Sequence, residues 1–184
     1  MPQGIIQAET SILCVVDIQE RLLPHMSESE RVVAGTDRLI RAAQMLKVPV
    51  VVTEQYPNGL GPTVEAVKAH ISPDIPVLEK TLFSCYGAPE FEELIEKSGR
   101  FTLVLCGIET HVCVLQTALD AAEKGLRVVV VADAVSSRSP ENHQQALCRL
   151  RQAGVTIATT EMVLMEWVGD AKHPAFKDVQ KLIK

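Results

Sequence analysis

A chain of 184 residues has the size of one domain and is long enough to bury a substantial core. Apolar residues make up 47% of the chain and charged residues 22%, a composition that excludes a disordered or fibrous protein. The net charge of −5, with no cluster of Lys or Arg, argues against a nucleic-acid partner, and no apolar run is long enough to span a membrane. We therefore expect residues 1–184 to form a single globular domain.

The first residues and the cysteines indicate the compartment. Residues 1–9 lack the basic start and the long apolar segment of a secretory signal. The five cysteines are an odd number without Cys-x-x-Cys spacing, which fits neither a disulfide framework nor a zinc ribbon. We expect a cytoplasmic protein that carries free thiols.

Six apolar segments are expected to form strands. Four of them are rich in β-branched residues and do not alternate apolar with polar positions, as is typical of strands buried on both faces of a parallel sheet: residues 12–16, 48–53, 101–106 and 126–132. Two shorter and weaker segments of the same kind are residues 75–79 and 155–159.

Helical patterns separate these strands, at residues 29–46, 89–97, 112–124 and 140–153, and two more follow at 161–168 and 174–183. Gly125 and Gly154 stand where C-terminal helix caps belong, and Ser139-Pro140 is typical of a helix start. Strands alternating with helices predict a doubly wound, Rossmann-like three-layer α/β/α fold with a mostly parallel sheet of about six strands. Residues 55–62, rich in Pro and Gly, are expected to form a loop near the functional site.

In open α/β sheets, ligands bind beyond the carboxyl ends of the strands. Asp17, Glu54, Lys80 and Asp133 stand at the ends of predicted strands, and Cys113 lies in the first turn of the helix that follows another. The partial positive charge of a helix N-terminus favours a thiolate. A thiol nucleophile needs a carboxylate to take its proton and a cation to hold the charges in place. The sequence therefore predicts that these groups converge at one edge of the sheet.

Each of these residues also has a purely structural interpretation. Cys113 could be a small buried residue, Asp17 could cap a loop, and Lys80 could be a surface lysine paired with Glu79 or Glu92. Asp133 is expected to tie down its own turn through side-chain hydrogen bonds.

The remaining thiols, histidines and the tryptophan are given lesser roles. Cys85 is the rival thiol, on a loop after Lys80, and His111 beside Cys113 suggests a Cys–His pair or a solvent-facing side chain. Trp167 is expected to pack internally or to form an oligomer contact. The residues expected to be structural or on the surface are Cys14, Cys106, Cys148, His25, His70, His143 and His173.

Three sequence blocks resemble the isochorismatase-like cysteine hydrolases, a superfamily that includes nicotinamidases and N-carbamoylsarcosine amidases. They are Cys14-Val15-Val16-Asp17-Ile18-Gln19, Lys80-Thr81-Leu82-Phe83-Ser84 and Gly107-Ile108-Glu109-Thr110-His111-Val112-Cys113-Val114. Matching helices and strands extend over nearly the whole chain, and the cysteine block is closest to a small, metal-free, poorly characterised branch. The resemblance implies an Asp–Lys–Cys triad formed by Asp17, Lys80 and Cys113, and a homo-oligomer.

The same resemblance implies a mechanism. Asp17 would take the proton of Cys113, Lys80 would hold the carboxylate and lower the pKa of the thiol, and the thiolate would attack a carbonyl carbon. The backbone N–H groups of Glu109 and Cys113 would form the oxyanion hole, beside a non-proline cis peptide between Ile108 and Glu109. Thr110, however, is also well placed to cap the helix, and its hydroxyl would then compete for the N–H of Cys113.

The chain departs from parts of the family pattern. Metal-dependent nicotinamidases carry an Asp-x-His pair and a further histidine after the second strand, whereas this chain has Glu54-Gln55-Tyr56 there and His70 alone downstream. We therefore expect no metal and no other cofactor. Vinyl-ether cleavage of the isochorismate kind uses no thiol, so a small amide, carbamoyl or related acyl substrate is expected, bound near Gln19, Tyr56, Phe83, Tyr86 and His111.

Two rival functions belong to other classes. A dinucleotide-binding Rossmann domain would carry a Gly-x-Gly-x-x-Gly turn after the first strand, but the chain has Asp17-Ile18-Gln19-Glu20-Arg21 there, without glycine. A non-catalytic binding or scaffold protein could also retain the hydrolase fold. The presence of all three triad residues argues against that alternative.

Overall fold

The computed structural model describes residues 4–184, so the first three residues of the N-terminal stretch discussed above lie outside the described residues. Six parallel strands form one sheet in the order β3-β2-β1-β4-β5-β6. The strands are β1 Ser11–Val16, β2 Val50–Gln55, β3 Val77–Lys80, β4 Thr102–Ile108, β5 Arg127–Ser136 and β6 Thr156–Ala158. The predicted fold class is confirmed, and both weakly patterned segments are strands.

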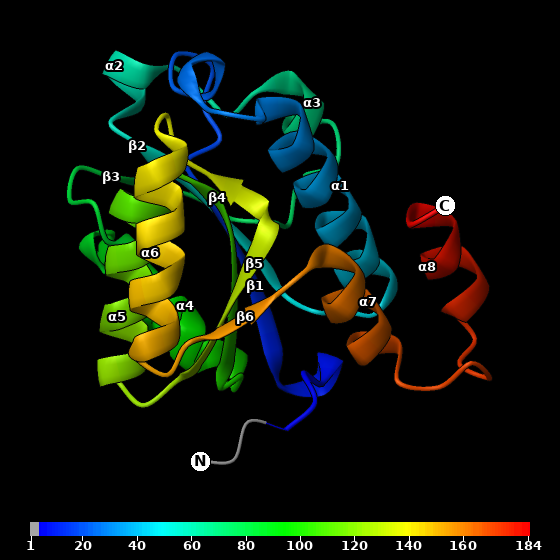
Figure 1. Cartoon of the computed structure of the whole chain (residues 1–184). Helices are drawn as coiled ribbons and strands as arrows, with labels where there is room; N and C mark the ends of the chain where they lie inside the picture. Colours follow the sequence, from blue (N-terminus) through cyan, green and yellow to red (C-terminus); the bar gives the residue numbers. More distant parts are fainter. Residues whose placement is uncertain (1–3) are drawn as a thin grey trace.

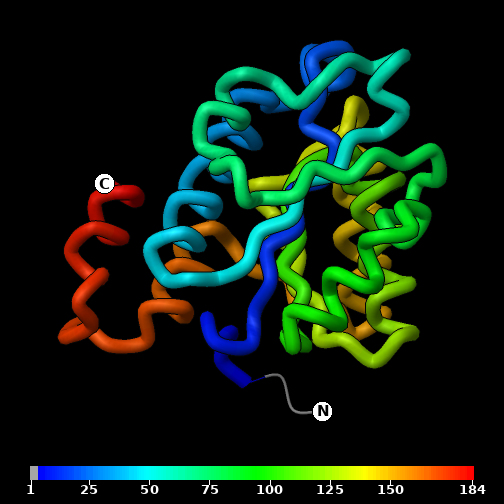
Figure 2. Tube along the Cα trace, turned by 180° about the vertical axis from the view of Figure 1, so that it is seen from behind, coloured from blue at the N-terminus to red at the C-terminus, as the bar shows by residue number. Residues whose placement is uncertain are grey.

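Helices cover both faces of this sheet (Figure 1). One face carries α1 Ser29–Met45, α3 Glu65–Lys68 and α7 Thr160–Val168, with α8 Phe176–Leu182 packed outside α1 and α7. The other face carries α4 Pro89–Ser98, α5 Leu115–Glu123 and α6 Pro140–Gln152. Seen from behind, α8 lies at one side of the molecule and the N-terminal segment at the end opposite the loops of residues 18–28 and 56–64 (Figure 2).

The alternation of side chains along β1 divides the core in two. Leu13 and Val15 pack in the cluster with α1 and α7, whereas Ile12, Cys14 and Val16 pack in the cluster with α4, α5 and α6. All six residues of β1 are buried, because each face of the strand is covered by a helical layer. Cys14, Cys85 and Cys113 therefore belong to the same layer of the core.

Gly107 allows β1 and β4 to approach closely near their carboxyl ends. It has a φ of 114°, and a Cβ atom there would lie 2.1 Å from the carbonyl oxygen of Val16. Sequence reasoning placed the end of the strand at this glycine, but β4 continues to Ile108 with a shift of register against β5 between Leu105 and Gly107. The glycine thus lets the chain continue toward Cys113 directly beside the end of β1.

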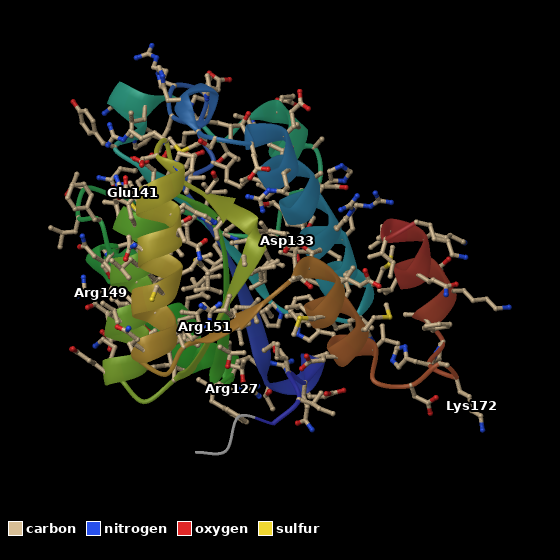
Figure 3. All side chains as sticks on the ribbon, in the orientation of Figure 1. Arg127, Asp133, Glu141, Arg149, Arg151 and Lys172 are labelled. Atoms are coloured by element: carbon tan, nitrogen blue, oxygen red, sulfur yellow. The ribbon has the colours of Figure 1, made fainter. Side chains whose placement is uncertain are left out.

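Asp133 lies in β5 near the start of α7 (Figure 3). Its Oδ1 accepts hydrogen bonds from the backbone N–H of Thr160 at 2.7 Å and from the Thr160 hydroxyl at 3.0 Å. The expectation that Asp133 ties down its own turn was wrong, because its partner is the first residue of a helix 27 positions away. The carboxylate satisfies a backbone donor that a helix start leaves free.

The helix boundaries follow the predicted signals closely. The Ser139 hydroxyl caps α6 by accepting from the N–H of Asn142, and Gly125 and Gly154 adopt positive φ directly after α5 and α6. The segment expected to be a loop at residues 55–62 contains one helical turn, α2 Pro57–Leu60, and α3 was not predicted. Within residues 4–184, no helix has the length and apolar character needed to cross a membrane.

Candidate active site

Asp17 directly follows β1 and is buried completely. Its backbone has a φ of 52°, a left-handed conformation that Asp tolerates better than most residues. The two carboxylate oxygens have different partners: Oδ2 accepts from Lys80 Nζ at 2.7 Å, and Oδ1 accepts from the Thr53 hydroxyl at 2.7 Å. The negative charge of this carboxylate acts on the nearby Cys113 thiol and raises its pKa.

Lys80 is the last residue of β3, and its side chain is completely shielded from solvent. Besides Asp17, Nζ donates to Gln55 Oε1 at 2.6 Å and to the backbone carbonyls of Leu82 and Phe83 at 3.3 and 2.9 Å. Burial alone would lower the pKa of Lys80, but the charge of Asp17 and the hydrogen bond to it outweigh this effect, so the pKa is raised. Lys80 is therefore a fixed, charged ammonium group and not the surface lysine of the alternative interpretation.

Cys113 lies in a π-helical turn, Thr110–Val114, which follows β4 and leads into α5. The sequence prediction placed it in the first turn of an α-helix, a difference that side-chain periodicity does not reveal. The Glu109 carbonyl accepts from the N–H groups of Val112 and Val114 at 3.1 and 3.2 Å, which widens this turn. The peptide bond between Ile108 and Glu109 is cis, as the family resemblance implied.

The predicted depression of the Cys113 pKa was wrong. Burial raises the pKa of this thiol, which is only 5% exposed, and the negative charge of Asp17 raises it further. Lys80 lowers it, but by less than these two effects together. Cys113 therefore rests as a thiol beside the ion pair of Asp17 and Lys80.

The end of β2 contributes two residues that sequence reasoning missed. Thr53 and Gln55 contact Asp17 and Lys80, whereas Glu54, which was expected at this site, accepts from the N–H and hydroxyl of Thr63 at 2.6 and 2.7 Å. Successive side chains of a strand point to opposite faces, so Thr53 and Gln55 share one face and Glu54 takes the other. Polar residues two apart at the carboxyl end of a buried strand were the signal for this pair.

Three of the five tentative pocket residues flank the loops beyond β2 and β3. Gln19 is buried and uses its amide on backbone groups, donating to Gln55 O and Gly61 O and accepting from Gln55 N–H. It holds residues 55–61 in place. Tyr56 and Phe83 are 54% and 52% exposed and lie beside the residues that bind Lys80.

Tyr86 turns away from these loops. Its ring packs edge-on against Phe91, with the ring centroids 5.1 Å apart, and the ammonium group of Lys124 lies 5.1 Å from the Tyr86 centroid. These contacts place its ring on the α4 and α5 side of the molecule.

Glu109, directly before the π-helical turn, and His111, within it, form a polar cluster. His111 Nδ1 lies 2.9 Å from the Ser137 hydroxyl and 3.9 Å from Glu109 Oε2. The buried Glu109 side chain accepts from the backbone N–H of Arg138 at 3.0 Å and from its guanidinium group at 3.2 Å. These contacts link the end of β4 to the segment that follows β5.

Thr110 does not cap the turn that contains Cys113. Its hydroxyl lies 2.9 Å from His143 Nδ1 on α6, and the turn has no side-chain cap. The expected competition between a Thr110 cap and the N–H of Cys113 is therefore absent from this described site. His143, which was expected on the surface, is half-buried, and its pKa is lowered by burial and by the charge of Arg31.

The other thiols and Trp167 lie in the core or on a helix surface, apart from the pairing of Asp17 with Lys80. Cys85 is buried in a short helical turn, and its Sγ lies 3.6 Å from the Thr53 hydroxyl. Cys14 and Cys106 are buried in strands, and Cys148 is exposed on α6, as predicted. Trp167 donates to the Ser11 hydroxyl at 3.0 Å and is buried within the chain.

Two surface pockets lie at opposite ends of the sheet. One of about 330 Å³ borders Lys80 and is lined by Tyr56, Pro57, Asn58, Glu79, Thr81 and Gly87. A larger one, of about 750 Å³, lies by the starts of β2 and β3, the end of the sheet away from the triad. No group of three or more His, Cys, Asp and Glu residues that could hold a metal ion occurs within residues 4–184.

Comparison with known proteins identifies the family. Residues 11–162 match the model of the isochorismatase domain. The chain belongs to the isochorismatase family. It is 44% identical to mouse isochorismatase domain-containing protein 2A over 181 residues, which cover 98% of this chain and 86% of that protein.

Two solved isochorismatase-family folds align over nearly the full length. One is the MAR1 ribonuclease of Caenorhabditis elegans, with a TM-score of 0.92, 42% identity and coverage of 98% of this chain and 92% of that one. The other is the YcaC gene product of Escherichia coli, described as an octameric hydrolase of unknown specificity, with a TM-score of 0.88, 25% identity and coverage of 100% and 96%. The predicted family and the hydrolase fold are confirmed.

Proposed function

We propose that this isochorismatase-family chain is a cysteine hydrolase that cleaves a small amide, carbamoyl or related acyl substrate through a thioester on Cys113. The observation that carries the proposal is a buried carboxylate, Asp17, that accepts from a fixed ammonium group 2.7 Å away and whose charge acts on the nearby Cys113 thiol. A nucleophile, a base and an orienting cation within one dry site are the parts that acyl transfer requires.

In the proposed first step, Asp17 accepts the Cys113 proton while Sγ forms a bond to the substrate carbonyl carbon. Collapse of the tetrahedral intermediate breaks the bond to the leaving amine, which takes the proton back from Asp17. Water then enters, gives its proton to Asp17 and attacks the thioester, and Cys113 leaves and is reprotonated. Lys80 stays charged throughout and holds the carboxylate in place.

The oxyanion of each tetrahedral intermediate would be bound by the backbone N–H groups of Glu109 and Cys113. What supports this assignment is that the Thr110 hydroxyl is engaged by His143 and does not cap the turn. The Glu109 side chain, held by Arg138, fixes the residue that precedes the turn. His111, and Tyr56 and Phe83 across the site, would border the substrate.

The test uses a panel of small amides and carbamoyl compounds with intact-mass detection of an acyl adduct. We expect an adduct that maps to Cys113 and disappears in Cys113→Ala, while Cys148→Ala, which alters an exposed thiol on α6, retains it. Adduct formation by Cys113→Ala would contradict the mechanism. Equal alkylation of Cys113 and the buried cysteines would instead favour the alternative, a scaffold protein that retains the fold.

The name of the C. elegans relative raises the question of RNA. Arg127 at the start of β5 and Arg149 and Arg151 in the last turn of α6 lie toward the end of the sheet opposite α2 (Figure 3). Arg127 also donates to the backbone carbonyls of Gly4 and Ile5. With a net charge of −5 and these arginines away from the triad, a small uncharged or acyl substrate fits this chain better than a polyanion. RNA belongs in the panel as a direct comparison.

We also propose a homo-oligomer, which the octameric E. coli relative supports. Tyr56, Leu82 and Phe83 expose 54%, 64% and 52% of their surface on the loops beside Lys80, an apolar rim suited to a second copy of the chain. Leu82→Glu should lower the molar mass measured by light scattering, whereas Ile5→Glu at the other end of the molecule should not. An unchanged mass for Leu82→Glu would remove this rim from the interface.

A further inference from the structure

Asp17 receives a second fixed hydrogen bond that the proposed mechanism does not use. The Thr53 hydroxyl donates to Oδ1 at 2.7 Å, on the oxygen opposite the one that binds Lys80. Both Thr53 and Asp17 are fully buried, so water does not compete for this bond. The backbone N–H of Asp17 in turn donates to the carbonyl of Thr53 at 3.1 Å, so the two residues are held by backbone as well as by side chain.

The same hydroxyl is the end of a chain of buried donors. An ionised carboxylate has no proton to give, so the proton of the Thr53 hydroxyl lies toward Asp17. The Cys85 thiol, 3.6 Å from that hydroxyl oxygen, must then be the donor in the contact between them. Thr53 and Cys85 therefore both direct their donated protons toward Asp17.

Hydrogen bonds also connect Cys85 to Cys113. The backbone N–H of Cys85 donates to the Thr117 hydroxyl at 2.9 Å, and that hydroxyl donates to the carbonyl of Cys113 at 2.7 Å. The turn that contains Cys85 thus contacts the base through Thr53 and the nucleophile through Thr117. The Cys85 thiol itself is fully buried.

We infer that Thr53, supported by Cys85, is a positioning residue that keeps Asp17 ionised and directed at Cys113. A hydrogen bond to the charged form of an acid favours that form, and bonds to ions are stronger than bonds between neutral groups. Without the hydroxyl, the Asp17 carboxylate loses one of its two fixed side-chain donors and keeps Lys80 alone. This inference rests on the proposed function, because it concerns the base of that mechanism.

The test measures the rate at which iodoacetamide alkylates Cys113 as a function of pH, by peptide mass spectrometry on the full chain. Thr53→Val preserves side-chain shape and removes the donor. We expect the acid limb of the profile, the low-pH part in which the alkylation rate rises with pH, to move to higher pH. The rate on that side should be about tenfold lower than in the parent chain. Thr53→Ser retains a hydroxyl and should restore the limb. Cys85→Ala should shift it in the same direction by less.

Thr36→Val is the matched control, since it removes an equally buried hydroxyl from α1 on the other face of the sheet. An unmoved acid limb in Thr53→Val, or an equal shift in Thr36→Val, would overturn the inference while leaving the proposed function intact. A parent chain in which Cys113 reacts no faster than Cys14 or Cys106 would overturn the proposed function, and this inference with it.

Discussion

At the scale of single residues, Cys113 combines a buried thiol with an adjacent carboxylate. Burial and the Asp17 charge both raise the pKa of the thiol, so little thiolate exists before substrate binds. In the proposed mechanism the proton therefore moves to Asp17 as the new bond forms, and the basicity of that carboxylate governs the step. Sequence reasoning predicted a lowered pKa for this thiol because a helix start and a lysine were visible in the chain, whereas the depth of burial was not.

Asp17→Asn separates two effects of the carboxylate: its action as a base and the effect of its charge on the pKa of Cys113. At pH 7 we expect alkylation of Cys113 to slow by at least about tenfold, because the base is gone. As pH rises, the rate should climb as it does for a simple thiol, and the loss of a neighbouring negative charge lowers the pKa of Cys113 relative to the parent chain. The labelling of Cys148 in the same sample serves as the internal standard. An unchanged rate at pH 7 would remove Asp17 as the base.

Lys80→Met tests the buried ion pair. Both side chains are fully shielded, so removing the ammonium group leaves an unpaired buried charge, which costs about 3–5 kcal/mol of unfolding free energy. Urea unfolding should show this loss, and the double variant Lys80→Met/Asp17→Asn should lose less than the sum of the single variants. A loss below about 1 kcal/mol for Lys80→Met would mean that Asp17 has become protonated or solvated at little cost.

At the scale of elements, the strands and long helices were predictable because their apolar patterns and caps are local. The β-branched runs gave all six strands, and Ser139, Gly125 and Gly154 marked helix ends that the structure confirms. Contacts between residues far apart in the chain were not predictable. Thr53 meets Asp17 across 36 positions, and Thr110 meets His143 across 33, and neither partner carries a local signal of the other.

Of the candidate site, the three residues of the triad were identified from strand ends and family resemblance, and the structure brings them together. Glu54 was selected instead of Thr53 and Gln55 because it is the charged residue at the end of the predicted strand. The alternation of the strand turns Glu54 toward Thr63 and turns Thr53 and Gln55 toward the triad. The π-helical turn also escaped prediction, since its five residues stand at the start of the helix and are too few to show an apolar period of their own.

The close approach of β1 and β4 makes a clear prediction for Gly107→Ala. The added Cβ would lie 2.1 Å from the Val16 backbone oxygen, and the residue would keep a left-handed conformation. We therefore expect the free energy of unfolding to fall by more than about 3 kcal/mol, or the chain to fail to fold. Gly125→Ala is the control, because its φ is also positive, at 86°, but its Cβ would meet nothing within 4 Å. That variant should lose only about 1–2 kcal/mol, or about 2–8 °C in Tm. Similar losses in both variants would contradict the steric argument.

At the scale of the whole molecule, buried thiols should limit stability in alkali. Burial raises the pKa of Cys106 from its ordinary value of 9.0 to about 12. Between these values the unfolded chain releases this proton and the folded chain keeps it, so stability is fully present below pH 9 and falls as pH rises toward 12, by at most about 4 kcal/mol from this group.

Urea unfolding from pH 8 to 10.5 measures this effect. Cys106→Ala should flatten the decline relative to the parent chain, after a pH-independent cost for the lost side chain. Cys148→Ala, at an exposed position, should leave the decline unchanged. Parallel declines in the parent chain and in Cys106→Ala would show that other groups cause the loss.

The bond from the Cys85 amide to the Thr117 hydroxyl has a consequence for amide hydrogen exchange. This N–H is buried, and its acceptor also binds the Cys113 carbonyl, so deuterium reaches it only when the turn at Cys85 separates from the start of α5. The exchange rate of one backbone amide thus reports how often the wall behind the nucleophile opens. It supplies a measure of site dynamics that needs no substrate.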